Sequence, residues 1–587
     1  MIVTPQFGPL IGPDGITFRL WAPAAKSVEL LAGETHPMTR RGNGWFEATV
    51  LGAKPGARYL FRIDGEIDVP DPASAFQPHD ISGPSEVIDA NFHWRATGWK
   101  GRPWTECVFM ELHVGTFTPA GTFRGVIGEL DRLADLGITA IELMPLSDFP
   151  GRWNWGYDGV LPFAPDSVYG QPEDLKALID AAHQRGLMMF LDVVYNHFGP
   201  EGNYLRRYAP KFFVEAQTPW GRAIDYRVPE VRTFVIENAL HWLDTYRFDG
   251  LRLDAVHAIV EPGETSVLTD LSKAAGALAR ETSRHIHLVL ENDDNVADLL
   301  DPLTDPPDGK YRAQWNDDYH HAWHVLLTGE SAGYYKDYKN VERHLARSLP
   351  EGFAYQGELS LHRKGTPRGE PSLNLPATAF VDFLQNHDQI GNRPLGERLS
   401  TLAKSEAVEA AFAITILSPA IPLLFMGDEW GATQPFPFFC DFKGELADAV
   451  RQGRKREFAE AYANPNLEVP DPLAEQTVRL ATLHSGALTE IQHKRLDMTR
   501  RLIAARKSFV MPILPAIEAG TSRASIQDDM LSAHWFFQSG QALKIIANLS
   551  DRPIKGPLLA GAHEWFWGGA PGETLAPWSV HAAIGGR

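Results

Sequence analysis

The chain has 587 residues, of which 44% are apolar, and it carries a formal net charge of −19 with an isoelectric point near 5.6. This length predicts several domains with a large buried core. The negative charge repels polyanions, so nucleic acid and anionic membranes are poor partner candidates. Cys107 and Cys440 are too few for a disulfide framework and lack zinc-ligand spacing, so we expect both thiols to be reduced and structural.

The two ends of the chain predict β-rich domains. Residues 1–90 contain short alternating apolar segments broken by Gly and Pro, such as ITFRLWAPAAKSVELL at 16–31, which is typical of a small β-sandwich. Residues 510–587 return to short β-like segments, and we expect a C-terminal β-domain there. The chain shows no signal-like opening and no apolar run long enough to span a bilayer, so we expect a cytoplasmic protein.

Between these ends, residues 91–509 alternate apolar runs with helical patterns. The strand candidates are 108–114, 140–146, 187–196, 250–256, 287–292, 313–315, 378–386 and 421–429. The clearest helical patterns are 125–137, 172–186, 230–246 and 493–509. Such repetition predicts parallel strands joined by crossover helices. Eight candidates favour an α/β fold with a closed (β/α)8 TIM barrel, and an open doubly wound sheet is the alternative.

Polar residues gather at the carboxyl ends of the predicted strands, where function lies in such a barrel. They are Asn196, His197, Asp254, Glu291, His387, Asp388, Asp428 and Glu429. The aromatic stretch 147–170 is too long for a simple connector, so we expect a loop over the same mouth. We interpret Asp428 and Glu429 as structural, because Asp254, Glu291 and Asp388 already fill the catalytic roles described below.

The segment FDGLRLDAVHAI, residues 248–259, places Arg252 and Asp254 on one face of a strand. The guanidinium favours an ionised Asp254, as a nucleophile requires, although an Arg-x-Asp pair is also common as a structural ion pair. Partial burial of Glu291 on the next strand would raise its pKa and keep a proton available. Two such carboxyls predict a glycosidase, and the spacing of adjacent strands favours retention of configuration.

Four segments resemble the signature segments of the α-amylase family of glycoside hydrolases, in the usual order. They are DVVYNHFG (192–199), GLRLDAVH (250–257), LEND (290–293) and FLQNHDQIGN (383–392). The resemblance implies that Asp254 is the nucleophile, Glu291 the general acid/base and Asp388 a transition-state stabiliser. It further implies sugar contacts by Tyr157, His197, Arg252 and His387. The N-terminal region resembles the sandwich that precedes the barrel in isoamylases and branching enzymes.

Further segments, 195–205, 314–330, 385–399 and 438–458, are similar to the trehalohydrolase branch of this family. That branch cleaves the α-1,4 bond beside a terminal trehalose, which implies a neutral α-glucan oligosaccharide as substrate. The tract WNDDYHH, 315–321, could form a sugar-binding loop, a solvated loop or a metal cluster. The resemblance to the trehalohydrolases favours the sugar interpretation, and a metal cluster is disfavoured because glycoside hydrolysis requires no metal or other cofactor. The implied contacts are His257, Asn316, Asp317, Asp318, His320 and Gln389.

Three other functions remain open at this stage. A glucan branching enzyme would share the domain plan and the carboxylates, but it would pass the glycosyl intermediate to a sugar hydroxyl. An isoamylase-like debranching enzyme is a weaker form of the same alternative. A non-catalytic glucan-binding protein is the least favoured, because Asp254, Glu291 and Asp388 are all present.

Overall fold

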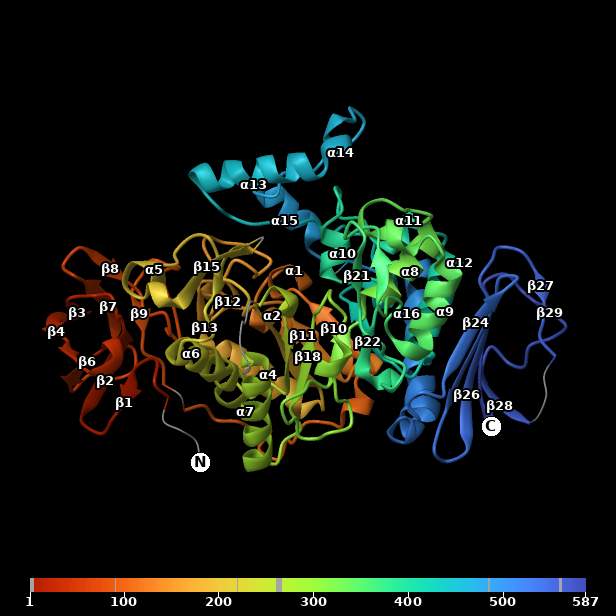
Figure 1. Ribbon diagram of the computed structural model, residues 1–587, viewed down its shortest axis with the longest axis horizontal. Helices are drawn as coiled ribbons and strands as arrows, with labels where there is room; N and C mark the ends of the chain where they lie inside the picture. The colour runs from red at the N-terminus through yellow and green to blue at the C-terminus, as the bar shows by residue number, and fades with distance from the viewer. Residues whose placement is uncertain (1–4, 90, 219, 260–265, 484–485, 559–561) are drawn as a thin grey trace.

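The computed structural model describes residues 5–587 except 90, 219, 260–265, 484–485 and 559–561. A small β-sandwich stands at one end, a barrel surrounded by helices occupies the centre, and a second β-domain stands at the other end (Figure 1). In the described part of the chain, no helix combines the length and apolarity needed to cross a membrane.

The N-terminal sandwich consists of two antiparallel sheets with the strand orders β1-β2-β6-β5 and β4-β3-β7-β8. Alternation explains the burial: β2 buries Ile16, Phe18 and Leu20 on one face. The bounds are β1 Leu10–Ile11, β2 Gly15–Trp21, β3 Val28–Ala32, β4 Glu34–Pro37, β5 Thr39–Arg40, β6 Trp45–Leu51, β7 Arg58–Ile63 and β8 Ile67–Val69.

The central strands close into a barrel in chain order, with parallel pairing throughout. The last strand pairs with the first, which confirms the predicted (β/α)8 barrel and shows that the open-sheet alternative was wrong. The bounds are β10 Phe109–Leu112, β11 Ala140–Leu143, β14 Met188–Val193, β17 Gly250–Leu253, β18 His287–Leu290, β19 Ala313–Trp315, β22 Phe380–Asp382 and β23 Ile421–Phe425.

The surrounding helices follow the predicted patterns with two differences. The pattern at 125–137 forms two helices, because Gly128 weakens helix continuity where they meet. The pattern at 230–246 ends in a π-helical turn at His241–Thr245. The helices are α2 Phe123–Ile127, α3 Leu130–Leu136, α4 Pro172–Gln184, α6 Pro229–Leu240, α7 Val267–Thr282, α11 Leu399–Leu402, α12 Ser405–Leu417 and α16 Glu490–Ala505.

Two insertions interrupt the alternation of strands and helices in the barrel. The first lies between β19 and β22 and holds α8 Asp317–Thr328, α9 Val341–Glu351, β20 Glu358–Ser360 and β21 Thr366–Arg368. The second follows β23 and holds α13 Gly444–Glu457, α14 Ala459–Ala463 and α15 Glu475–Ala481. Figure 1 shows α13 and α14 standing above the barrel as a separate arm.

The C-terminal domain is a five-stranded antiparallel sheet with the order β24-β25-β26-β30-β28, beside the pair β27-β29. The bounds are β24 Arg523–Gln527, β25 Met530–Phe536, β26 Gln541–Asn548, β27 Ile554–Lys555, β28 His563–Trp567, β29 Thr574–Leu575 and β30 Val580–Gly586. β24 packs beside α9 and β30 beside α12, so this domain covers one side of the barrel (Figure 1).

Candidate active site

Arg252 organises the polar groups at the carboxyl ends of the strands. The barrel register sets it beside Asp192 on β14. Its Nη1 donates to Asp192 Oδ2 at 2.6 Å and to Asp254 Oδ1 at 2.8 Å, while Nη2 lies 3.6 Å from Glu291 Oε2. The guanidinium lies over the Trp315 ring, 4.2 Å from its centroid. Burial alone would lower the pKa of Arg252, but the carboxylates outweigh this effect and raise the pKa well above its ordinary value.

Asp254 follows β17, and both oxygens of its carboxylate accept hydrogen bonds. Oδ1 accepts from Arg252, and Oδ2 accepts from Asn196 Nδ2 at 3.0 Å. The next residue, Ala255, has a φ of 40°, which is rare for a residue with a side chain, and its N–H donates to Glu291. The Asp254 side chain keeps 15% of its surface exposed. The chain therefore fixes one oriented and accessible carboxylate at this position.

Glu291 stands at the end of the neighbouring strand, and β17 and β18 pair in parallel register. Burial raises the pKa of Glu291 well above its ordinary value, as expected from its apolar strand. Arg252 opposes this increase, whereas the charges of Asp254, Asp317 and Asp388 add to it. A carboxyl that holds its proton near neutral pH can donate it to a leaving group.

Asp388 lies in the first turn of the short helix α10, His387–Gly391, instead of at the end of β22. Asn386 caps this helix, and its Oδ1 accepts from the Asp388 N–H at 2.9 Å. The exposed carboxylate of Asp388 accepts from Asn392 Nδ2 at 2.8 Å. Asp388 is close enough to Glu291 for its charge to raise the pKa of that carboxyl.

Tyr157 and His387 form a hydrogen-bonded chain next to Arg252. The Tyr157 hydroxyl donates to Asp192 Oδ2 at 2.6 Å and accepts from His387 Nε2 at 2.8 Å, while His387 Nδ1 donates to Glu111. Burial alone would lower the pKa of His387, but Glu111 outweighs it and raises the pKa. His387 is only 2% exposed, whereas the ring of Tyr157 is half-buried. The histidine therefore holds the Tyr157 hydroxyl in place, and the predicted contact of His387 with a sugar stays a prediction.

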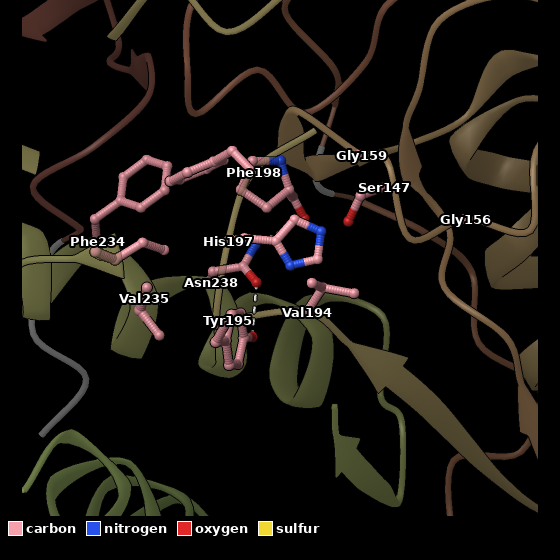
Figure 2. Close-up of a pocket in the computed structure, with 12 residues that line it drawn as sticks. Ser147, Gly156, Gly159, Val194, Tyr195, His197, Phe198, Phe234, Val235 and Asn238 are labelled. Atoms are coloured by element: carbon pink, nitrogen blue, oxygen red, sulfur yellow. Dashed lines mark hydrogen bonds between the residues drawn. The ribbon is translucent and has the colours of Figure 1, made fainter. Parts of the chain in front are cut away.

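His197 borders a small cavity, shown in Figure 2, together with Ser147, Val194 and Phe198. Its Nε2 donates to the Tyr157 carbonyl at 3.0 Å, and its Nδ1 contacts Asn196. Burial lowers the pKa of His197. The cavity encloses about 20 Å³, which is room for little more than one water. This cavity is too small for a sugar ring, and the predicted sugar contact of His197 stays a prediction.

Three residues predicted to contact sugar are buried structural groups, and we correct that prediction. Asn316, Asp318 and His320 are each 1% exposed. Asn316 donates to Asp382 at 2.7 Å, and Asp318 accepts from Arg368 at 2.6 Å. Both ring nitrogens of His320 are hydrogen-bonded to protein groups. The sequence pattern did not reveal this, because α8 begins inside the tract and turns these side chains into the core.

Asp317, Gln389 and His257 each contact another polar group of the site. Asp317 is half-buried and accepts from Gln389 Nε2 at 3.0 Å. Burial, followed by the charge of Asp293, raises the pKa of Asp317 to about 7. His257 is exposed, and its Nδ1 accepts from the Asp293 N–H at 3.3 Å. These three side chains remain candidates for contact with the leaving part of a substrate.

Sequence reasoning missed three buried acids inside the barrel. Glu111, Glu142 and Asp192 lie on the first three strands, and the register pairs Glu111 with Glu142. Burial raises the pKa of Asp192 to about 6 and that of Glu142 well above its ordinary value. The sequence did carry a signal for these three acids. Like Arg252, each is a charged residue inside an otherwise apolar strand.

Two further acids match the structural interpretation. Glu429 is fully buried and accepts from Arg132 at 2.8 Å, and Asp428 accepts from Gln385. Within the described ranges, no cluster of three or more His, Cys, Asp or Glu side chains could hold a metal ion.

Three family models match parts of the chain. Residues 89–211 match the alpha-amylase catalytic domain, and residues 6–75 match carbohydrate-binding module 48, the isoamylase N-terminal domain. Residues 519–581 match a domain of unknown function, DUF3459.

Curated relatives cover most of the chain. A malto-oligosyltrehalose trehalohydrolase from Deinococcus radiodurans is 45% identical over 505 residues, which are 85% of this chain and 82% of the relative. The chain belongs to the malto-oligosyltrehalose trehalohydrolase family. Another member, from Saccharolobus solfataricus, is 39% identical over 86% of this chain and 87% of its own length. A branching enzyme from Rubrobacter xylanophilus is 36% identical, but it covers only 42% of this chain and 39% of its own length.

Two solved structures share the overall fold of this chain. A Salmonella typhimurium protein, whose assignment as an alpha amylase is provisional, superposes with a TM-score of 0.94 at 44% identity. The match covers 99% of this chain and 100% of that one. A Paenibacillus barengoltzii pullulanase matches with a TM-score of 0.72 at 19% identity over 100% of this chain and 96% of its own, and it shares the fold alone.

Proposed function

We propose that the protein is a retaining glycoside hydrolase that cleaves the α-1,4-glucosidic bond beside the terminal trehalose of maltooligosyltrehalose and releases trehalose. This proposal depends mainly on one observation: Asp254 and Glu291 follow adjacent strands and both lie beside one buried arginine, Arg252. The relatives named for this activity, which match over more than four fifths of their own length, support the choice of substrate.

In the first step, Asp254 attacks the anomeric carbon while Glu291 protonates the glycosidic oxygen of the departing trehalose. Asp254 is fixed by Arg252 and Asn196, so the attacking oxygen has little freedom to lose. Because its pKa is raised, Glu291 keeps the proton that it donates in this step. Asp388 stabilises the positive charge that develops on the sugar ring.

In the second step, the ionised Glu291 takes a proton from water, and this water attacks the covalent glycosyl intermediate on Asp254. The maltooligosaccharide leaves with its original anomeric configuration, because two inversions have occurred. Tyr157 keeps a half-buried ring beside this centre, and its hydroxyl is held between Asp192 and His387. We assign it to stacking against the sugar that reacts.

Product analysis tests this function. Purified protein is incubated with a maltooligosyltrehalose, with the matching unmodified maltooligosaccharide and with amylose. We expect rapid release of free trehalose and much slower attack on the other two substrates. Asp254→Asn should lower turnover by several orders of magnitude and leave the circular dichroism spectrum unchanged. Turnover near the wild-type rate in this variant would exclude Asp254 as the nucleophile.

A branching enzyme remains the second candidate, because one such relative matches the chain over 281 residues. It would form the same intermediate on Asp254 and transfer it to a sugar hydroxyl. New α-1,6 linkages in amylose, with no free trehalose from maltooligosyltrehalose, would favour this function over hydrolysis.

A further inference from the structure

A second cavity lies behind the ends of the seventh and eighth barrel strands. It encloses about 380 Å³, a size typical of small-molecule sites, and α11, α12, the segment after β23 and the start of α16 surround it. Its lining includes none of the three proposed catalytic carboxylates. It is therefore separate from the site that cleaves the glycosidic bond.

Arg495 distinguishes this cavity from an ordinary packing defect. Arg495 lines the cavity and is 8% exposed. Its guanidinium lies over the Phe412 ring, 4.0 Å from the ring centroid. The guanidinium makes no hydrogen bond or ion pair with any residue that the structure describes, and its buried Nε is without a partner. Arg506 also has a buried Nε without a partner, but its Nη1 and Nη2 donate to the carbonyls of Ile416, Ser418 and Ala420.

A buried N–H donor without a partner is costly, and no residue in the described part of the chain accepts a hydrogen bond from the Arg495 guanidinium, so an acceptor in the cavity would lower this cost. Burial lowers the pKa of Arg495 to about 10, which leaves it a cation at neutral pH. The cavity also contains two carboxylates, Glu409 and Asp428. Glu409 is only half-buried and accepts from Ser405 at 3.4 Å, so it can accept further hydrogen bonds.

The cation and the two carboxylates together determine which ligand charge the cavity can accept. The two carboxylates repel an anion, and the N-terminus of α16 offers no free anion site because Thr489 already caps it. Arg495 in turn repels a cation. A neutral ligand with hydroxyl groups suits both kinds of side chain, because a hydroxyl can accept a hydrogen bond from Arg495 and donate one to a carboxylate.

The apolar part of the lining fits the same class of ligand. Leu399, Val408, Phe412 and Trp430 are buried and border the cavity. A pyranose ring has apolar C–H faces and a rim of hydroxyls, which matches apolar walls with a few polar groups. We propose that this cavity is a second, non-catalytic binding site for a neutral saccharide of one or two rings, held by Arg495 and Glu409.

Crystals soaked with maltose, with trehalose and, separately, with inorganic phosphate test the occupant. We expect sugar density in the cavity with hydroxyls on Arg495, and no phosphate there. The comparison of maltose with trehalose shows whether the site takes the glucan part or the trehalose part of a substrate. Phosphate on Arg495, or sugar at the catalytic carboxylates alone, would overturn the proposal.

Titration calorimetry with the same sugars tests the residues. Arg495→Met should weaken the second binding event at least tenfold and leave turnover unchanged, since methionine is apolar and unbranched and no described ion pair of Arg495 would be broken. Arg500→Met, an exposed change on the same helix, is the matched control. Glu409→Gln keeps the shape of the lining and should weaken the same event. Equal second-site binding in wild type, Arg495→Met and Glu409→Gln would rule the site out.

Discussion

At the residue scale, the catalytic proposal depends on how neighbouring charges set the proton affinity of Glu291. Burial gives the largest increase in its pKa, and Asp317 and Asp388 add to it. Asp317 has a pKa of about 7, so it is ionised mainly above that pH. The proton on Glu291 is thus retained most strongly where Asp317 is charged.

Replacing Asp317 with Asn should therefore lower the pKa of Glu291. Because the acid form of Glu291 is the active form in the first step, the alkaline limb of kcat/KM should move to lower pH, by about half a unit. The pH profile of the variant against wild type measures this shift. Asp294→Asn, a change on a nearby exposed residue, should leave the limb in place. An alkaline limb that does not move in Asp317→Asn would contradict the coupling.

The Glu111–His387 pair gives a stability prediction. Glu111 raises the folded-state pKa of His387 although burial opposes it, so the stabilisation is complete below the unfolded pKa of about 6.5 and is lost as pH rises through the higher folded value. Glu111→Gln should lower the free energy of unfolding by about 1–3 kcal/mol at acidic pH and by less at alkaline pH. Denaturant unfolding at several pH values measures the difference. A loss that grows with pH would show that the pair is not an ion pair.

At the element scale, the arm formed by α13 and α14 reaches Asp388, a proposed catalytic residue, through one side chain. Arg454 of α13 donates to the Gly391 carbonyl at 2.9 Å and to Asn392 Oδ1 at 3.3 Å, and Asn392 in turn donates to Asp388. The guanidinium also lies 4.8 Å from the Phe438 ring centroid. A helix that looks peripheral in Figure 1 thus helps to orient Asp388.

Arg454→Met should lower kcat between about tenfold and a hundredfold, because Asn392 would no longer hold Asp388 in a single position. The effect on KM and on the melting temperature should be small, since α13 belongs to an arm that stands apart from the barrel core (Figure 1). Arg456→Met, an exposed change on the same helix, is the control. A loss confined to the melting temperature would assign Arg454 to stability alone.

At the scale of the whole molecule, the N-terminal sandwich is joined to the barrel by an aromatic contact. Phe7 is 8% exposed and lies between Trp45 of the sandwich and Phe234 of α6, at centroid distances of 4.9 and 5.0 Å. Its backbone N–H donates to Glu237, also on α6, at 3.1 Å. The contact therefore couples the two domains through side chain and backbone together.

Phe7→Ala should remove about 3 kcal/mol from the free energy of unfolding, because the surrounding rings cannot close the cavity. Protease cleavage between the sandwich and the barrel should also become faster. Ile11→Ala changes a half-exposed residue of the same segment and serves as control. If Phe7→Ala matched this control in both measurements, the two domains would be held together by other contacts.

The sequence by itself determined the barrel, its eight strands and the places of Asp254 and Glu291 directly after two of them, because parallel strands and crossover helices leave strong local patterns. It also determined that Arg252 and Asp254 share a face, since side chains alternate along a strand. Tertiary structure alone decided that Asn316, Asp318 and His320 face the core, because the orientation of α8 depends on its packing against other elements. It also decided which distant groups meet at the centre, such as Glu111 with His387 and Arg454 with Asn392, since no local pattern records contacts between remote segments.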